Sequence, residues 1–479
     1  ALGHGRAQLQ YVTIGGTKAG KVTHYQLHAI QDSGGFADMG TILAPFMTRP
    51  MSSGVYAIPN IECRTTSVVT NTTPIVAYRG AGRPEATAAI ERAMDLFALE
   101  IGKDAAEVRR MNLIPKFLEP HTTVVGQTYD VGDYETALDK ALDAADYKAL
   151  RAEQAKRRAS GDAKQLGIGV SVYVEITGGV GNGESAKVEV LEDGRAVVYT
   201  GTSPHGQGHD TAWSMLVQEQ TGIPMDRIEL VWGDTDLVPV GTGTMGSRSL
   251  QQGGNAVFQV AGTLAEKAKS VAARLLEVSE ADVVLDKDRG AFHVVGTPAV
   301  TKTWADLAVA EKSTGGLLHD EVINVSGATF PFGAHVAVVE VDTETGRVKH
   351  LRQVACDDAG KVLNPMLLDG QIHGGIAQGV AQALLEEVLY DADGNPTTSN
   401  LADYGFISAA ELPNVEVIHM ETPTPVNAIG AKGIGESGTI GSTPAIQSAV
   451  VDAVSHLGVK HIEMPCTAER VWRAIQAAQ

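Results

Sequence analysis

The feature that most constrains the fold of this chain is a pattern that occurs five times, in which a polar, glycine-rich loop leads into a stretch with helical apolar spacing. The glycines let the backbone approach a ligand closely, and the free N–H groups at a helix start suit an anionic group. An ordinary strand-to-helix connection explains any one such loop, but it explains five of them less well. We therefore expect the loops to converge on one ligand. They begin at Arg79, His205, Gly241, Asn364 and Gly430.

The last of these loops, residues 430–444, carries a single carboxylate, that of Glu436, among several glycines. Thr443 as N-cap, Pro444 at the first helical position and apolar residues at helical spacing beyond them predict a helix that starts at the end of the loop. A lone carboxylate beside a ligand-binding backbone is suited to acid–base work, so Glu436 is the best catalytic candidate. The alternative for a glutamate in such a turn is a capping or solvated position.

Two glycine strings show that the motif is weak without its context. Residues 433–438 spell GxGxxG, but a nucleotide-binding fingerprint needs a preceding strand and an acidic residue about 20 positions on. Residues 422–427 read instead as an extended linker, so a nucleotide-dependent dehydrogenase stays open as an alternative that lacks its strand. Residues 181–185 repeat Gly-x-Gly-Glu-Ser ahead of an alternating strand, and we expect Glu184 to be structural or a rim residue.

The loops share a lining chemistry. They are rich in Gly, Ser, Thr and Gln, which donate hydrogen bonds without negative charge, and positive charge comes from Arg79, Arg83, Arg248 and Lys432. A large, polar, phosphate-bearing cofactor needs such a lining.

Composition limits the class of protein. The chain has 479 residues, of which 43% are hydrophobic, so it can bury a large core and should contain more than one domain. A net charge of −19 argues against a nucleic-acid surface, for which a basic face is expected. The sequence contains neither an apolar run of about 18 residues nor a charged-then-apolar leader, so we predict no membrane span and no secretory signal.

The three cysteines are widely spaced and form no C-x-x-C pair, which leaves no credible four-thiolate iron–sulfur site. Any electrons that this chain handles must therefore leave for a partner. Free thiols in a chain of this length favour a reducing compartment, and we expect a cytoplasmic protein, with the periplasm left open. The cysteines are Cys63, Cys356 and Cys466.

The coarse organisation is α+β, with hairpins alternating with the loop–helix units. Hairpins are predicted over residues 8–30, 184–200 and 334–355, with turns at their glycines. The charged helical stretch from about 135 to 160 reads as a linker region. We expect two lobes, residues 1–150 and 151–479, that together form one cofactor cleft.

Four motifs carry a family resemblance. In order and spacing, the segments 77–85, 206–209, 370–375 and 432–437 resemble those of the molybdenum hydroxylases, the family of xanthine dehydrogenase, aldehyde oxidase and carbon monoxide dehydrogenase. The likeness runs over essentially the whole chain, which is similar to the molybdopterin-binding large subunit of bacterial members. It implies the fold of that subunit, with two molybdopterin-binding lobes around one cleft.

The resemblance also implies a function. The expected activity is the oxidative hydroxylation of an aldehyde or an N-heteroaromatic carbon with oxygen from water. The expected cofactor is molybdenum on molybdopterin cytosine dinucleotide, held by the pterin dithiolene with no direct protein ligand to the metal. Electrons would pass to a small iron–sulfur subunit and an FAD-binding medium subunit, in an assembly expected to be a dimer of heterotrimers.

Residue roles follow from the resemblance position by position. Glu436 matches the general base, and Arg79 matches an arginine that orients the substrate or stabilises negative charge on it. Gln207 matches a glutamine near the apical oxo ligand, and Gln371 matches one near the pterin or metal. The other residues expected at the cofactor lie in the same loops: Gly80, Ala81, Gly82, Arg83, Gly208, His209, Ser247, Arg248, Lys432, Gly433 and Gly435.

Two departures from the family pattern matter. Members that oxidise carbon monoxide carry a copper-binding cysteine directly after the loop arginine, where this chain has Gly80, which argues against carbon monoxide as the substrate. The chain also starts where relatives are already well into the large subunit. A fragment, a processed chain and a naturally split subunit are all open, with a separate chain supplying the rest in the last case. Each leaves this chain with an incomplete cofactor site, and a non-catalytic assembly subunit is the alternative function.

Overall fold

The computed structural model of the protein describes residues 3–178, 183–325 and 327–478. Its centre is a four-stranded sheet with the strand order β16-β15-β14-β6, in which β15 and β16 run parallel and the other neighbours antiparallel. This sheet mixes residues from the middle and the end of the chain. Its strands are β6 (Lys164–Val174), β14 (Phe332–Asp342), β15 (Val348–Asp358) and β16 (Val415–Met420).

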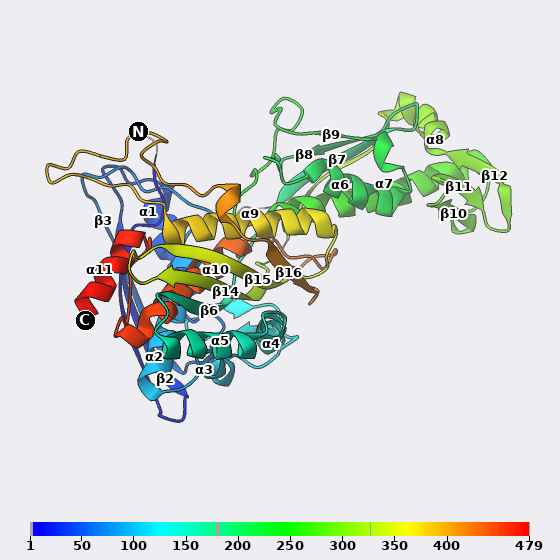
Figure 1. Ribbon diagram of the computed structural model, residues 1–479. Coiled ribbons are helices and arrows are strands. Elements are labelled where there is room, and N and C mark those ends of the chain that lie inside the picture. Colours follow the sequence, from blue (N-terminus) through cyan, green and yellow to red (C-terminus); the bar gives the residue numbers. More distant parts are fainter. Residues whose placement is uncertain (1–2, 179–182, 326, 479) are drawn as a thin grey trace.

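Both faces of the central sheet are covered, and most residues of β6, β14 and β15 are buried, although β15 carries several polar side chains (Figure 1). Alternate residues of β14 point to two different cores: Val336 packs with α4, and Val339 packs with α9 and α10. The covering helices are α4 (Tyr134–Ala144), α5 (Tyr147–Ser160), α9 (Pro365–Leu384) and α10 (Ser437–Val454), and α11 (Ala468–Ala478) closes the chain.

The N-terminal part forms a second sheet, β1-β2-β3, which packs on α2 and shares a hydrophobic core with β6 and β14. Residues from both of the predicted lobes therefore contribute to this core. Its elements are β1 (Gln8–Gly16), β2 (Val22–Asp32), α1 (Met39–Thr48), β3 (Asn60–Val68), α2 (Arg83–Ile101), α3 (Ala105–Asn112), β4 (His121–Thr122) and β5 (Thr128–Tyr129).

Residues 184–323 project away from the central sheet as a layer of strands backed by two helices (Figure 1). The strand order is β13-β7-β8-β9, and a small sheet, β10-β11-β12, lies at the far end. The strands are β7 (Glu184–Val190), β8 (Ala196–Thr200), β9 (Ile228–Val231), β10 (Val283–Asp286), β11 (Ala291–Val294), β12 (Thr297–Thr303) and β13 (Leu317–Ile323). The helices are α6 (His209–Thr221), η2 (Ser249–Gly254, a π-helical turn), α7 (Asn255–Leu276) and α8 (Trp304–Glu311).

The three predicted hairpins are confirmed as β1-β2, β7-β8 and β14-β15. The predicted start of the last long helix is wrong: α10 begins at Ser437, and Thr443 and Pro444 lie inside it. The hydroxyls of Ser442 and Thr443 donate to the carbonyls of Gly438 and Thr439, one turn back, as helical hydroxyls do. Tight packing of Gly438 on Gly375 of α9 stabilises this early turn, which N-cap preferences alone do not reveal. Within the residues described, no helix combines the length and apolar character needed to cross a membrane.

A glycine contact fixes α10 on the central sheet and yields a stability prediction. A Cβ on Gly169 of β6 would overlap the carbonyl oxygen of Ala445 in α10. We expect Gly169→Ala to lower the free energy of unfolding by about 1–3 kcal/mol, since the backbone must move apart. Gly370→Ala in α9 is the control, because a Cβ there meets no atom within 4 Å and alanine favours a helix. Denaturant unfolding of both variants checks the prediction, and an unchanged Gly169→Ala would contradict it.

Candidate active site

The five glycine-rich segments meet at one cavity of about 480 Å³. Arg79 comes from the loop before α2, Gln207 from the loop before α6, Ser247 from the loop before η2, and Gln371 from α9. The loop before α10 supplies Glu436. Ten of the predicted site residues line the cavity: Arg79, Gln207, His209, Ser247, Arg248, Gln371, Lys432, Gly433, Gly435 and Glu436. The other five, Gly80, Ala81, Gly82, Arg83 and Gly208, are not among the residues that line it.

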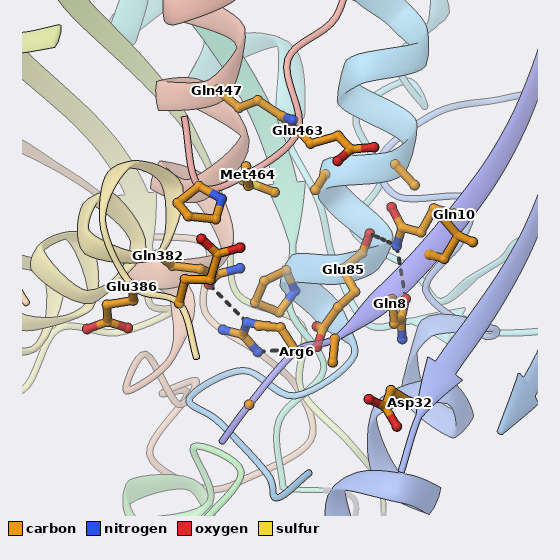
Figure 2. A pocket seen from close by; sticks show the side chains of 18 of the residues that line it. Arg6, Gln8, Gln10, Asp32, Glu85, Gln382, Glu386, Gln447, Glu463 and Met464 are labelled. Carbon is orange, nitrogen blue, oxygen red and sulfur yellow. Dashed lines mark hydrogen bonds and ion pairs between the residues drawn. The ribbon is translucent and has the colours of Figure 1, made fainter. Parts of the chain in front are cut away.

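A larger cavity of about 660 Å³ lies between β1 and α2 and is lined by none of the predicted site residues (Figure 2). Several of its polar groups bond to one another: Arg6 donates to Gln382, at 2.9 Å, and lies 3.4 Å from Glu85. Arg6 also donates to the carbonyl oxygen of Arg79 at 2.7 Å. Arg6 lines this second cavity and not the active-site cavity, and it therefore holds the Arg79 loop from outside the active site.

Glu436 is held as an acceptor on both carboxylate oxygens. Oε1 accepts from the Gly80 N–H at 2.7 Å, while Oε2 accepts from Arg83 and lies 3.1 Å from the Ser247 hydroxyl. Burial alone raises the pKa of Glu436, but Arg83, the Gly80 N–H and Ser247 outweigh it, so the pKa lies below its ordinary value. The carboxylate is therefore ionised at neutral pH, as a general base must be.

A second glutamate, Glu175, stands behind Glu436 and was missed by sequence reasoning. It directly follows β6 and is fully buried. Its Oε1 lies 2.6 Å from the Ser247 hydroxyl and 3.5 Å from Arg83, and its Oε2 accepts from Ser437. Burial, and next the charge of Glu436, raise the pKa of Glu175 to about 8. The signal that could have found it is a carboxylate directly after a strand that is mostly apolar.

Arg83 lies between the two glutamates and is only 4% exposed. It is the first residue of α2, whose N-cap, Gly82, has φ 92°. A Cβ at Gly82 would lie 2.5 Å from the carbonyl oxygen of Ala44, so this turn requires glycine. Burial lowers the pKa of Arg83, but the two glutamates outweigh it and leave the pKa raised. The positive charge of Arg83 therefore interacts with both glutamates and not with the cavity.

Arg79 forms no ion pair with any residue that the structure describes. Its guanidinium donates to the Gly435 carbonyl at 2.5 Å, to Gln378 at 3.0 Å and to the Gln371 carbonyl at 3.1 Å. Burial lowers the pKa of Arg79 somewhat, but an arginine remains a cation. An oriented cation thus lies on the cavity wall next to Glu436.

The remaining predicted residues fall into two groups. Gln207 accepts from the His205 N–H, and Gln371 Oε1 lies 3.4 Å from Arg79, so both amides lie at the cavity. His209 stacks on Trp213 with ring centroids 4.7 Å apart. Burial lowers the pKa of His209, which makes it a neutral ring at pH 7.

Arg248 and Lys432 line the cavity, but their charges are paired in the interior. Arg248 forms a buried ion pair with Glu184 at 2.5 Å, and Lys432 forms one with Asp358 at 2.9 Å. Glu184 is thus placed as the buried partner of Arg248. These ion pairs anchor the loops, and a direct role at a cofactor stays a prediction for both basic residues.

Ser247 and Gly433 bring two of the loops into close contact. Ser247 has φ 53°, an uncommon conformation for a residue with a side chain. A Cβ on Gly433 would overlap the carbonyl oxygen of Ser247. The loops before η2 and α10 therefore touch backbone to backbone, which holds the Ser247 hydroxyl beside both glutamates.

The lining suits a large anionic cofactor. Four helix starts border the cavity, at His209, Ser249, Asn364 and Glu436, and helix N-termini favour negative charge. Among the described lining residues Glu436 is the only carboxylate. The buried indole N–H of Trp213 has no hydrogen-bond partner in the part of the chain described here. Within those same residues, no group of three or more His, Cys, Asp or Glu side chains could hold a metal ion.

Comparison with known proteins agrees with this lining. Molybdopterin cofactor-binding domain families match residues 1–113 and 140–413. The carbon monoxide dehydrogenase large chain of Hydrogenophaga pseudoflava is 39% identical over 97% of this chain and 60% of that protein. The solved structure of the Cu,Mo-CO dehydrogenase matches with a TM-score of 0.92 and 35% identity, over 99% of this chain and 62% of that one.

The structure of quinoline 2-oxidoreductase from Pseudomonas putida 86 matches with a TM-score of 0.91 and 31% identity, again over 99% of this chain and 62% of that one. The chain thus spans about 60% of the length of the curated relatives it matches. The expected fold is confirmed as that of the large subunit of a molybdenum hydroxylase. The chain belongs to the molybdopterin cofactor-binding family of the xanthine dehydrogenase and carbon monoxide dehydrogenase type.

Proposed function

We propose that this chain is the catalytic part of a molybdenum hydroxylase large subunit, which oxidises a C–H bond with oxygen from water. The substrate carbon loses two electrons and gains a hydroxyl group from water, and two protons are released. The observation that carries the proposal is the ionised carboxylate of Glu436 at the wall of a cavity that is otherwise neutral or basic.

Glu436 takes a proton from the attacking oxygen, because its carboxylate is ionised and partly accessible at the cavity. Arg79 orients the substrate and stabilises negative charge that develops on it, since its cation is free of an acidic partner among the described residues. Gln207 and Gln371 lie at the cavity and supply amide hydrogen bonds.

Molybdenum on molybdopterin cytosine dinucleotide is the cofactor that this cavity would hold, and when bound it supplies the two-electron redox chemistry. The loops around Gln207, Ser247, Gly433 and Gly435, together with the helix starts beside them, would hold its polar groups. The two proposed lobes, residues 1–150 and 151–479, both contribute, through the Arg79 loop and the other four segments respectively.

An N-heteroaromatic compound or an aldehyde is the substrate class that we favour over carbon monoxide. Gly80 occupies the position after Arg79, with φ 95°, and a Cβ there would lie 2.8 Å from the ring of Pro84. A thiolate side chain fits poorly at this turn, and no cysteine lines the described part of the cavity. The carbon monoxide dehydrogenases match this chain at a higher identity than quinoline 2-oxidoreductase does, so the choice rests on Gly80 and the missing thiolate and not on overall likeness.

The electron acceptors are proposed to be an iron–sulfur subunit and an FAD subunit, in a dimer of heterotrimers. The chain's own thiols, Cys63, Cys356 and Cys466, are free, and the last two are buried. Burial raises the pKa of each of these two thiols to about 12, which suits structural roles. Free thiols also support a cytoplasmic location.

Metal analysis of the complex purified from its native source tests the proposal. We expect molybdenum at about one atom per copy of this chain, iron on a separate small subunit and no copper. An intact complex without molybdenum would overturn the proposal and favour the assembly subunit. Copper in proportion to molybdenum would overturn the choice of substrate class.

A further inference from the structure

The active site contains a carboxyl group that the proposed reaction does not use. We propose that Glu175 is a positioning residue, which keeps one proton next to Glu436 and, through the Ser247 hydroxyl, holds the base ionised and aimed at the cavity. The inference deepens the proposed function and rests on Glu436 being the base. Glu175 itself is fully buried and does not line the cavity.

Counting hydrogens leads to this arrangement. The Ser247 hydroxyl lies 2.6 Å from Glu175 Oε1 and 3.1 Å from Glu436 Oε2, but it has one hydrogen to donate. Two ionised carboxylates would leave one of these oxygens facing the hydroxyl oxygen without a hydrogen between them. A proton on Glu175 Oε1 removes the conflict, because Glu175 then donates to Ser247 and Ser247 donates to Glu436.

The contacts of Glu436 indicate that this carboxyl is the ionised one and does not carry the shared proton. Its Oε1 accepts from the Gly80 N–H and its Oε2 from Arg83, and both hydrogen bonds favour its ionised form, so in the resting enzyme the proton is held more readily by Glu175. Glu175 is 3.5 Å from Arg83, well beyond the closer contact that Arg83 makes with Glu436. The neutral carboxyl is therefore Glu175 and the ionised one is Glu436.

Among the described residues, the charged or titratable groups that face Glu175 are Arg83 of α2, Glu436 before α10, Arg79 from its loop and Tyr173 of β6. With Glu175 neutral, Arg83 and Glu436 form a balanced ion pair, and Arg79, which makes no ion pair with Glu175, contributes one positive charge at the cavity wall. Burial and the charge of Glu436 raise the pKa of Glu175 to about 8, so the proton stays on through neutral pH and leaves above it.

The backbone conformation of Ser247 places its hydroxyl between Glu175 and Glu436. Ser247 adopts φ 53°, which is unfavourable for a residue with a side chain and recurs where function requires it. The conformation is held by Gly433, whose Cα faces the Ser247 carbonyl, and by Arg248, which is anchored to Glu184.

Infrared difference titration of the complete enzyme tests the proposal without any need for turnover. The carbonyl stretch of a protonated buried carboxyl is followed from about pH 5 to about pH 10 in the wild type, Glu175→Gln and Glu436→Gln. We expect a band that disappears near pH 8 in the wild type and is absent from Glu175→Gln. In Glu436→Gln the same band should titrate at a clearly lower pH, because the neighbouring negative charge is gone.

A wild-type band that survives Glu175→Gln, or one that does not move in Glu436→Gln, would overturn the proposal. The second comparison remains decisive if Glu175→Gln fails to fold. If Glu436→Gln turns over at the wild-type rate while its carbonyl band shifts to lower pH as expected, Glu436 is not the general base, but the proton shared between Glu175 and Glu436 is still supported. The two failures are therefore distinguishable.

Discussion

Replacement of Glu436 by Gln is expected to lower kcat by about 10²–10⁴-fold while molybdenum stays bound. The amide cannot accept a proton at neutral pH, and with one oxygen it can satisfy either the Gly80 N–H or Arg83, but not both. Glu175 can ionise in this variant and neutralise Arg83, so we expect the fold to survive. Steady-state turnover, normalised to the molybdenum content of each preparation, measures the effect.

Glu184→Gln is the matched control for this prediction. It changes a glutamate in the same Gly-x-Gly-Glu-Ser string, but one that is fully buried against Arg248 and outside the cavity lining. We expect it to lower the unfolding temperature and to loosen the loop before η2, with the losses in activity following those in stability. Turnover near the wild-type level in Glu436→Gln would rule out the general base.

The sequence predicts the parts of this structure that rest on local chemistry. The hairpins follow from alternating residues around glycine turns, and α9 begins at Asn364-Pro365 as an N-cap and a first-turn proline predict. The repeated glycine-rich loop before a helix also predicts the convergence on one cavity, because each repeat has the same local requirement. Glu436 could be selected as a catalytic candidate for that reason.

The charges of the site could not be predicted in the same way. Arg83, Arg248 and Lys432 read as a basic lining, but each pairs with an acid far along the chain: Glu436, Glu184 and Asp358. Which carboxylate meets which cation depends on how the sheets and loops pack. Glu175 was missed for the same reason, since its partners Ser247 and Ser437 lie 72 and 262 residues away.

The early start of α10 is a third case in which packing decides. Residues 437–442 carry two glycines and no apolar stripe of their own, so their propensity alone does not favour a helix. Because residues 438 and 375 are glycines, α10 and α9 pack very closely together. A Cβ added to Gly375 would lie only 3.0 Å from the Cα of Gly438. That contact exists only in the folded chain, and it places Glu436 directly at the helix start.

Arg83→Met is expected to lower the free energy of unfolding by roughly 3–5 kcal/mol at neutral pH, because it removes the guanidinium that pairs with the largely buried, ionised Glu436 and lies beside Glu175. In the wild type, the depressed pKa of Glu436 stabilises the fold above the ordinary glutamate pKa, and this contribution is lost as the pH falls. Without Arg83, burial raises the folded pKa of Glu436 instead, so its contribution reverses and stability falls as the pH rises.

The difference in unfolding temperature between the wild type and Arg83→Met should therefore widen from about pH 4 to about pH 8. Thermal unfolding of the two complexes across this range measures it. Arg83→Lys is the control, since it keeps the charge with fewer donors and should lose less stability. Activity of Arg83→Met at neutral pH should fall with the ionised fraction of Glu436. An unfolding temperature that is independent of this substitution at every pH would contradict the role of Arg83, because the largely buried Glu436 carboxylate would then stay ionised without the guanidinium that pairs with it.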